Sequence, residues 1–519
     1  DSEKISYTGV TPGMFYGVKR GVDGTLPAKH STGAKVFGLN KNFRSPASKD
    51  TIITDAVVTI PFNFDRVGFY YYDEKAGNWT LTAADSALGS QMLSGTTGIT
   101  VNPDSIARVG FTTAPMNGVA GNPMGPFIAQ SQDKFGNARA VAADTAVALS
   151  SNSGIAVAEV VAPGATSIKL DSSVGLTSPD GTVKIDDEII AYTSKTEDSL
   201  GGVNTTALHD VKANVQSGKF SLNGGAWVDT YSLVIPAGGT DAVFYYKDTK
   251  AGTNAVSAAI AGLTPASQPQ TVSPSTPFRL AFVNEPRQIT AGEVLAKDIL
   301  TLNSRDMYDN TTTVLADTVI ALTTNSTGTP VGGPAQFSTV VESSTSTWTP
   351  VSAVTIPNTK SDVGFFYKDT LAGSPLLRAS TSGLEAALQV QVVVPNVIKQ
   401  IRFISSPQTL IVGNPSSALV IQTQDIYGNA KSVDTSTGLL LGYYKNDSVI
   451  EHGSFSLNGD PDPNSWTATT VMIPINASAE TFYYQDIKSG SADLKTAAFG
   501  PDSSSMDVSS TEEFPAAGT

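Results

Sequence analysis

The sequence predicts an all-β protein, a series of tandem β-sandwiches with one small β module inserted among them. The main observation is a nine-residue stretch, FYYKDTKAG at 244–252, whose aromatic residues, Asp and Gly return in three further copies at 69–77, 365–373 and 482–490. An Ile-Pro pair precedes every copy by the same distance. The spacing of these signals predicts units of about 110 to 120 residues, the usual size of a β-sandwich. No segment shows the periodicity of an amphipathic helix longer than a turn or two.

Each copy places an invariant Phe and an invariant Tyr two positions apart, which puts both side chains on one face of a strand. The pairs are Phe69 and Tyr71, Phe244 and Tyr246, Phe365 and Tyr367, and Phe482 and Tyr484. We expect this face to be the core face. Aromatic residues at alternate positions can also stack on carbohydrate, but fourfold recurrence beside a turn favours packing. The D-x-x-x-G that follows is a turn, and the alternating run after it predicts that the two strands form a hairpin.

Composition narrows the classes of function. The chain of 519 residues contains no Cys, so disulfides, zinc–thiolate sites and thiol nucleophiles are excluded. The net charge of −14 argues against nucleic acid and anionic membranes as partners, because nothing would neutralise the phosphates. No run is long enough to span a bilayer, which predicts no membrane insertion in this segment. An acidic, Ser/Thr/Gly-rich, β-patterned chain predicts an extracellular or cell-surface location.

The first 36 residues have an internal partner at 186–215. Glu3 and Tyr7 match Glu188 and Tyr192, and the match extends to His30 and His209. Residues 1–36 are therefore predicted to be the C-terminal part of a small β module, and residues 37–102 the C-terminal half of a sandwich. An open half-sandwich would expose its core, so we expect upstream chain or a neighbour's strands to complete it. The strand after each module is expected at Phe37 and at Phe220.

Three further units open with a Phe-x-x-x-Pro strand, followed some twenty residues later by DKFGN at 133–137, DMYDN at 306–310 or DIYGN at 425–429. The predicted units are 103–270, 271–394 and 395–519, the last with a tail that holds a strand through Met506 and Val508. The first of them carries about fifty extra residues, which places the inserted module at about 157–216. Insertion at a loop tip is inexpensive because loop-closure entropy grows slowly with length. Short junctions containing Pro predict a stiff rod.

These signals together resemble those of bacterial Ig-like repeats, which occur in surface-layer proteins, surface fibres and invasin-like adhesins. The resemblance covers nearly the whole chain outside the inserted module. It implies immunoglobulin-like β-sandwiches and a cell-surface setting, whereas folds of this kind host many roles. The inserted module resembles a small β module of phage structural and tail proteins and of secreted repeat proteins.

Calcium is the cofactor that the sequence makes conceivable. The D-x-[FY]-G-N turns offer carboxylate, amide and carbonyl oxygens. The candidate ligands are Asp133, Asn137, Asp306, Asn310, Asp425 and Asn429. The alternative is an Asx-turn with Gly136 or Gly428 at positive φ. The run Asp460, Asp462 and Asn464 begins like an EF-hand loop, but its prolines and the missing Glu make that match fail.

No catalytic site is predicted. His30 and His209 hold the same place in the two module copies, which favours a packing or turn role, and the remaining His452 has no companion. No G-x-S-x-G elbow precedes a helix, and the acidic residues that stand out are repeated along the chain, unlike catalytic carboxylates. Four Trp residues, Trp79, Trp227, Trp348 and Trp466, could contact glycans, although three recur at one place in the repeat and so favour packing.

Three functions remain open. The first is a non-enzymatic extracellular rod that forms a homo-oligomer or polymer in a surface layer, sheath or filament. The second is an adhesin stalk or virion decoration protein that binds surface glycans. The third is the accessory region of a secreted polysaccharide-degrading enzyme.

Overall fold

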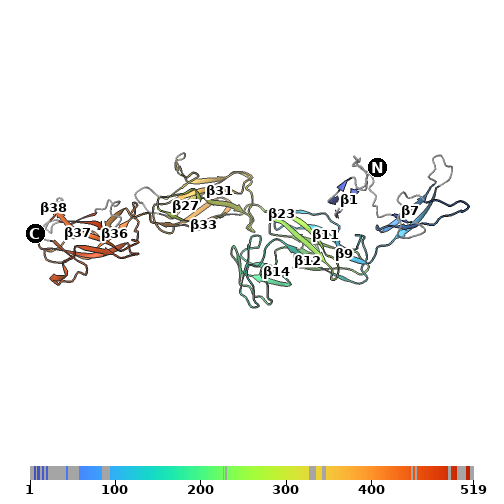
Figure 1. The fold of residues 1–519 in the computed structure, drawn as a ribbon, viewed down its shortest axis with the longest axis horizontal. Helices are drawn as coiled ribbons and strands as arrows, with labels where there is room; N and C mark the ends of the chain where they lie inside the picture. The colour runs from blue at the N-terminus through green and yellow to red at the C-terminus, as the bar shows by residue number, and fades with distance from the viewer. Residues whose placement is uncertain are drawn as a thin grey trace. The chain divides into compact units, whose positions relative to one another are not determined.

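A computed structural model describes fifteen stretches of the chain, and every structural statement below refers to them. They are residues 5–6, 9–11, 14–16, 19–20, 42–44, 58–84, 94–225, 227, 231–326, 335–341, 347–445, 448–449, 453–488, 492–499 and 510–514. These stretches form strands, turns and two single-turn 3-10 helices, Ala296–Asp298 and Pro463–Ser465 (Figure 1). The predicted all-β class is confirmed. The chain divides into two compact units, Asp1–Ser275 with Met307–Asn310, and Thr276–Asp306 with Thr311–Thr519.

The first unit contains a complete immunoglobulin-like β-sandwich. One sheet has the order β19-β21-β11-β9 and the other β10-β23-β22-β12-β20. Their bounds are β9 Ile106–Phe111, β10 Asn117–Val119, β11 Met124–Asp133, β12 Thr145–Asn152, β19 Lys219–Ser221, β20 Ser232–Ile235, β21 Asp241–Lys247, β22 Gly252–Ala259 and β23 Ala266–Ser273. Strand β10 pairs with β23 in parallel, and the other neighbours are antiparallel.

The repeated Phe and Tyr fill the space between the two sheets. Phe244 and Tyr246 are fully buried on β21, as the alternation predicts. Phe244 stacks on Phe127 with ring centroids 5.4 Å apart, and Phe220 contacts both Phe244 and Tyr246. Such aromatic contacts add to the stabilisation from burial by about 1 kcal/mol each.

The predicted hairpin at D-x-x-x-G is wrong. Strand β21 belongs to the four-stranded sheet and β22 to the five-stranded sheet, so the turn at 248–252 crosses from one sheet to the other. In the fourth repeat the strands Ala479–Asp486 and Ala492–Phe499 likewise belong to different sheets, whereas in the third repeat the strands Asp362–Lys368 and Leu376–Thr381 belong to one nine-stranded sheet but do not pair with each other. A hairpin and a crossing arch both need a turn between two alternating strands, so the sequence pattern cannot separate them. The main chain of the turn at 248–252 therefore lies at one end of the sandwich.

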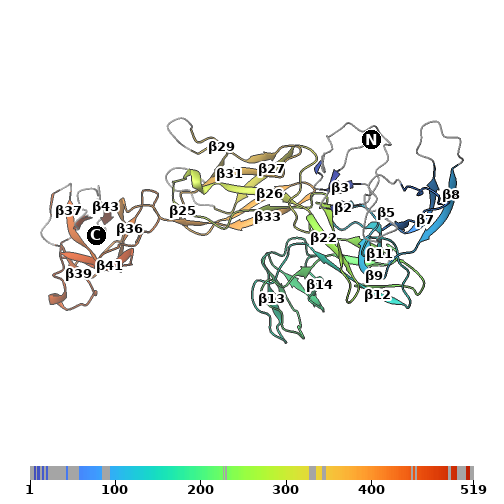
Figure 2. The same ribbon diagram turned by 45° about the vertical axis from the view of Figure 1, so that its right-hand side comes forward.

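The inserted module stands beside this sandwich with a core of its own, from Ile155 to Val215 (Figure 2). It has two three-stranded sheets, β13-β17-β16 and β15-β14-β18. Their bounds are β13 Ser167–Lys169, β14 Gly181–Ile185, β15 Glu188–Tyr192, β16 Ser194–Lys195, β17 Ser199–Gly201 and β18 Val215–Gln216. The Val215 amide donates to the Ile155 carbonyl at 2.9 Å, so the chain enters and leaves the module side by side.

The second unit contains two more sandwiches. In the third repeat the order β29-β28-β31-β26-β24 continues through one parallel pair, Arg279 with Glu385, into β33-β32-β27-β30, and β25 pairs with β34. Its strands are β24 Arg279–Phe282, β25 Gln288–Thr290, β26 Leu300–Arg305, β27 Thr318–Thr324, β28 Gln336–Ser338, β29 Pro350–Val351, β30 Ala353–Ile356, β31 Asp362–Lys368, β32 Leu376–Thr381, β33 Leu384–Val390 and β34 Val392–Val394.

The fourth repeat follows the same plan. One sheet is β35-β36-β41-β39, and the other contains β38-β37-β42-β43 with β40 beside β37. The strands are β35 Gln400–Phe403, β36 Leu419–Gln424, β37 Thr437–Lys445, β38 Ser448–Val449, β39 Gly453–Ser456, β40 Thr470–Ile473, β41 Ala479–Asp486, β42 Ala492–Phe499 and β43 Ser510–Phe514. The tail strand expected through Met506 and Val508 falls on residues outside the described set, and the described tail strand is β43.

The first repeat differs in its burial. Its described strands form two-stranded sheets: β5 Asn42–Arg44 with β6 Tyr70–Tyr72, β7 Gly77–Ala83 with β8 Gly95–Val101, and, nearer the start, β1 Ile5–Ser6 with β4 Lys19–Arg20 and β2 Gly9–Thr11 with β3 Met14–Tyr16. Phe43 pairs with Tyr71 as Phe220 pairs with Tyr246, so Phe43 holds the place expected of Phe37, which lies outside the described residues. Phe69 is 39% exposed, whereas Phe244 is fully buried.

Candidate functional site: turn-to-turn joints

Two kinds of turn recur in the repeats, and the structure brings them together. The first kind, here called the arch turn, is the D-x-x-x-G that connects two strands that do not pair with each other. Its Asp accepts a hydrogen bond from the Tyr hydroxyl two residues earlier, at 2.5 Å for Tyr367 and Asp369. The other carboxylate oxygen of Asp369 accepts from the Leu371 amide at 2.9 Å. Burial, followed by the hydrogen bond to Asp369, raises the pKa of Tyr367 far above its ordinary value.

The same Tyr–Asp contact shapes the other arch turns. The pairs are Tyr71 with Asp73 at 2.5 Å, Tyr246 with Asp248, and Tyr484 with Asp486 at 2.8 Å. Burial and the neighbouring Asp raise the pKa of Tyr71 to about 12. In the second repeat Asp248 also accepts from the hydroxyls of Ser153 and Ser217, each at 2.6 Å. The conformation of each arch turn is therefore fixed by hydrogen bonds within its own repeat.

The second kind, here called the Asn turn, is D-x-[FY]-G-N. Asp133 is fully buried, and its two carboxylate oxygens accept four N–H groups. The donors are the amides of Asp104, Phe135 and Asn137 and the side-chain amide of Asn137, at 2.8 to 3.0 Å. Burial raises the pKa of Asp133, but the hydrogen bonds from Asn137, Asp104 and Phe135 together outweigh it and the net pKa is lowered. Asp425 accepts the corresponding four groups from Asn396, Tyr427 and Asn429.

The Asn side chain of each Asn turn binds the main chain of the arch turn in the preceding repeat. Asn429 donates to the Thr370 carbonyl at 2.7 Å and accepts from the Ala372 amide at 2.8 Å. Asn137 makes the same two bonds with Glu74 and Ala76, at 2.6 and 2.9 Å, and Asn310 makes them with Thr249 and Ala251, both at 2.8 Å. Residues 307–310 accordingly count with the first unit. Three identical contacts define one repeated joint.

An aromatic ring closes two of the joints. A Cβ added to Gly292 would lie only 1.9 Å from the Tyr427 hydroxyl oxygen. A Cβ added to Gly121 would lie 2.2 Å from the Tyr308 hydroxyl oxygen. Both glycines have positive φ, 77° and 82°, and their amides donate to the carbonyl of the arch-turn Asp at 2.8 Å. Any side chain at Gly121 or Gly292 would therefore displace the ring. Phe135, in the joint with the first repeat, is 39% exposed.

The six candidate calcium ligands thus lie at the joints. The turn geometry matches the Asx-turn alternative, because Gly136 and Gly428 have φ of 88° and 89°. Among the described residues no group of three or more His, Cys, Asp or Glu is arranged to hold a metal ion. Calcium at these turns stays a prediction. Asp462 caps the 3-10 helix at Pro463–Ser465 by accepting a hydrogen bond from the Asn464 amide. This capping role agrees with the conclusion that the run is not an EF-hand loop.

The other singled-out side chains are packed or paired. Trp466 is buried and donates to the Asp460 carbonyl, and Trp348 donates to Gln336. Lys75, Lys247 and Lys368 lie over the rings of Trp79, Trp227 and Trp348, with Nζ 4.6 to 5.7 Å from the ring centroid. Glycan contact by these Trp residues stays a prediction. His30 and His452 lie outside the described residues, whereas His209 is buried in the module, which agrees with its predicted packing role.

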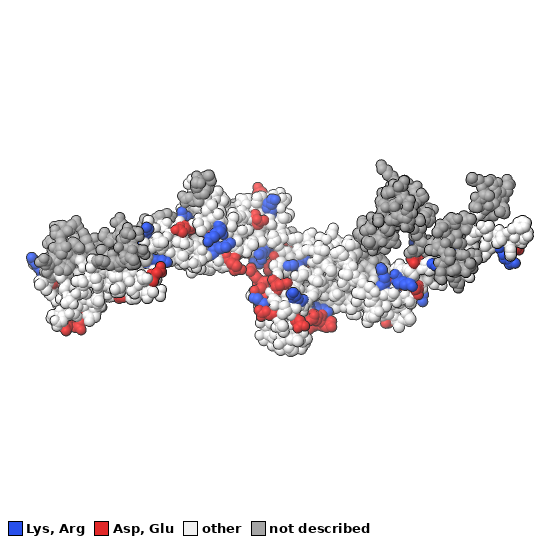
Figure 3. Space-filling view, viewed as in Figure 1, with Lys and Arg blue, Asp and Glu red and all other residues white. Residues whose placement is uncertain are grey.

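Acidic side chains gather around the inserted module (Figure 3). Among the described residues no helix is long and apolar enough to cross a membrane.

The sequence analysis identified both kinds of turn but did not predict the contact between them. The missed signal is the constant final Asn in DKFGN, DMYDN and DIYGN, although the position before it varies between Gly and Asp. An Asx-turn needs only the Asp, so a constant Asn four residues later indicates a further contact.

No family model matches the sequence, and no curated protein matches it. Several solved structures are similar in fold. The Escherichia coli adhesin FdeC has 13% identity and a TM-score of 0.27 over 80% of this chain and all of that chain. Invasin, a bacterial integrin-binding protein, has 11% identity and a TM-score of 0.25 over 79% of this chain and 59% of its own. Domains 4 and 5 of the S-layer protein SbsC have 15% identity and a TM-score of 0.15 over 28% and 67%.

Proposed function

We propose that the protein is a non-enzymatic stalk of the cell surface, in which joined Ig-like sandwiches hold a binding element away from the surface. The observation that carries this proposal is the joint, which recurs three times with the same pair of hydrogen bonds from Asn137, Asn310 and Asn429. A chain of independent domains on loose linkers would need no such contact.

The junction between the third and fourth repeats supports the proposal. Five residues separate β34, which ends at Val394, from β35, which begins at Gln400. One of them, Asn396, donates its amide to Asp425 and its side chain to the Ala291 carbonyl, each at 2.9 Å. Linker, Asn turn and arch turn therefore form one hydrogen-bonded network, which restricts bending between the two sandwiches. The extracellular setting rests on the acidic, Cys-free composition.

Self-assembly into a surface layer, sheath or filament is the second candidate. A specific observation favours it. In the first repeat Ile60 and Phe69 are 53% and 39% exposed, whereas their counterparts Ile356 and Phe365 are fully buried. An exposed core face of this kind can accept strands from a neighbouring molecule.

Sedimentation velocity of the natively purified protein over a wide concentration range, with and without a calcium chelator, separates the two candidates. A stalk gives one monomeric species throughout. Sheets or fibres, visible by negative-stain electron microscopy, would overturn the stalk in favour of self-assembly, and their loss on chelation would assign calcium to the assembly.

A further inference from the structure

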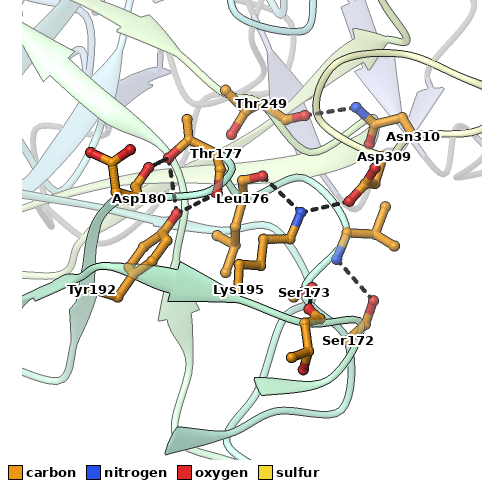
Figure 4. Close-up of polar contacts among 12 residues, drawn as sticks. Ser172, Ser173, Leu176, Thr177, Asp180, Tyr192, Lys195, Thr249, Asp309 and Asn310 are labelled. Carbon is orange, nitrogen blue, oxygen red and sulfur yellow. Dashed lines mark hydrogen bonds and ion pairs between the residues drawn. The ribbon is translucent and has the colours of Figure 1, made fainter. Parts of the chain in front are cut away.

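The inserted module touches the joint that Asn310 makes. Its loop at 172–177 contacts both the arch turn at 248–252 and the tip of the Asn turn at 307–310, which are bonded to each other (Figure 4). The Gly175 amide donates to the Tyr308 carbonyl at 2.7 Å. A Cβ on Gly175 would lie 2.6 Å from the Cα of Lys250, so this glycine permits the close approach.

A buried ion pair joins the module to the same tip. The Lys195 ammonium donates to Asp309 at 2.7 Å and to the Leu176 carbonyl at 3.1 Å. The side chain of Lys195 is 3% exposed and that of Asp309 18% exposed. A buried ammonium is strongly unfavourable unless it is paired, so Lys195 needs an anion at this place.

Asp309 stands where the other two Asn turns have Gly136 and Gly428. Its φ is 70°, in the left-handed region where a side chain costs about 1 kcal/mol and Asp is tolerated better than most residues. The Asn turn that contacts the module is thus the one of the three that has Asp in place of Gly at this position. The pair with Lys195 accounts for this exchange.

The loop that presents Gly175 and Leu176 is itself fixed from within the module. The Ser173 hydroxyl donates to the Thr196 carbonyl at 2.5 Å. The buried Tyr192 donates to the Thr177 carbonyl at 2.9 Å. These contacts hold the loop in shape independently of the joint, so the loop can act as a support.

We propose that the inserted module is a brace, which clamps the tip at 307–310 onto the arch turn at 248–252 through Lys195, Asp309 and Gly175. The inference rests on the proposed function, since a brace has a purpose only where a joint must resist movement. It gives the joint made by Asn310 a second layer of contacts beyond the Asn contact that all three joints share.

Hydrogen–deuterium exchange of the full-length protein tests the brace. The reporters are peptides covering 247–253 and 306–312, which contain the Ala251 amide bonded to Asn310. In Asp309→Asn the new side chain is isosteric and tolerates positive φ, but the charge is lost. We expect exchange in both peptides to rise by about tenfold or more, as removal of one partner of a buried pair predicts. Lys195→Met should do the same.

The control is Lys169→Met, which breaks the exposed pair of Lys169 with Asp198 in the same module and should leave both peptides unchanged. Asp309→Asn lies outside the module, so the test stands even if Lys195→Met unfolds it. Unchanged exchange in Asp309→Asn would overturn the brace. Asn429→Ala tests a joint that has no module beside it. If this variant speeds exchange at 370–373 while Asp309→Asn has no effect, the brace alone is refuted. If neither variant has an effect, the joint is refuted as well.

Discussion

At the scale of single residues, His209 shows how the module holds a charge in its interior. The imidazole is 1% exposed, and its two nitrogens lie 2.8 Å from Asp186 and from Glu188. Burial lowers the pKa of His209, but the two carboxylates outweigh it and the net pKa is raised. For Glu188 the two effects have the opposite signs. Burial raises its pKa, but hydrogen bonds from Thr206, His209 and Ala207 outweigh burial and lower the pKa to about 2.

These shifts predict how module stability depends on pH. The stabilisation from His209 is complete below its unfolded pKa, near 6.5, and is lost as the pH rises through the raised folded value. The stabilisation from Glu188 is complete above its unfolded pKa, near 4.5, and is lost as the pH falls through about 2. The module should be most stable between about pH 4.5 and 6.5. Thermal unfolding measured against pH checks this, and His209→Gln should abolish the loss on the alkaline side.

The Asn of the joint gives a second prediction. Asn429→Ala removes both bonds to the preceding arch turn and leaves the Thr370 carbonyl and the Ala372 amide without that partner. We expect the third and fourth sandwiches to lose about 2 kcal/mol of coupling, so that denaturant unfolding of the pair becomes less cooperative. Asn414→Ala, at an exposed asparagine in the same sandwich, is the matched control. Unchanged cooperativity in Asn429→Ala would contradict a coupling role.

At the scale of elements, the sequence was a good guide to strands and a poor one to their partners. Alternation correctly placed Phe365 and Tyr367 in the core, because burial of one face follows directly from the two-residue period. Sheet assignment depends on pairing between distant strands, which local alternation does not encode. The same reason explains why the joint was missed: Asn429 contacts residues 57 and 59 positions away, in another repeat.

The Tyr–Asp contact of the arch turn can be tested by removing one hydroxyl. Tyr367→Phe deprives Asp369 of its buried donor, and we expect a loss of about 1 to 2 kcal/mol in the free energy of unfolding of the third sandwich. Tyr72→Phe, which breaks an exposed Tyr–Glu contact of the same spacing, should have little effect. Denaturant titration compares the two variants, and equal losses would show that the buried contact has no special weight.

At the scale of the whole molecule, the cores are separate. The core clusters of the second sandwich and the inserted module share no buried residue. Repeat spacing predicted a module at this place in the chain, because an insertion changes the distance between two recurring signals. Its support of a neighbouring turn could not be predicted, since Lys195 and Asp309 are 114 residues apart and belong to no common pattern.

Removing the module should therefore leave the second sandwich folded. The strands that flank it meet at Ile155 and Val215, so a short Gly-containing turn can replace residues 156–214. Differential scanning calorimetry should show one transition lost, with the transition of the second sandwich retained. Loss of both transitions would mean that the sandwich depends on the module for its own folding.

The chemistry of the joint also bears on how such chains change over generations. The side chains of Asn137, Asn310 and Asn429 bind main-chain atoms of the preceding arch turn, and the first three repeats present these atoms alike. As far as these two hydrogen bonds are concerned, a repeat can thus be duplicated, deleted or exchanged by recombination without a compensating substitution in its new neighbour. The joint with Lys195 and Asp309 is different, because it matches one side chain to another. Exchange of one of those two repeats alone would separate Lys195 from Asp309.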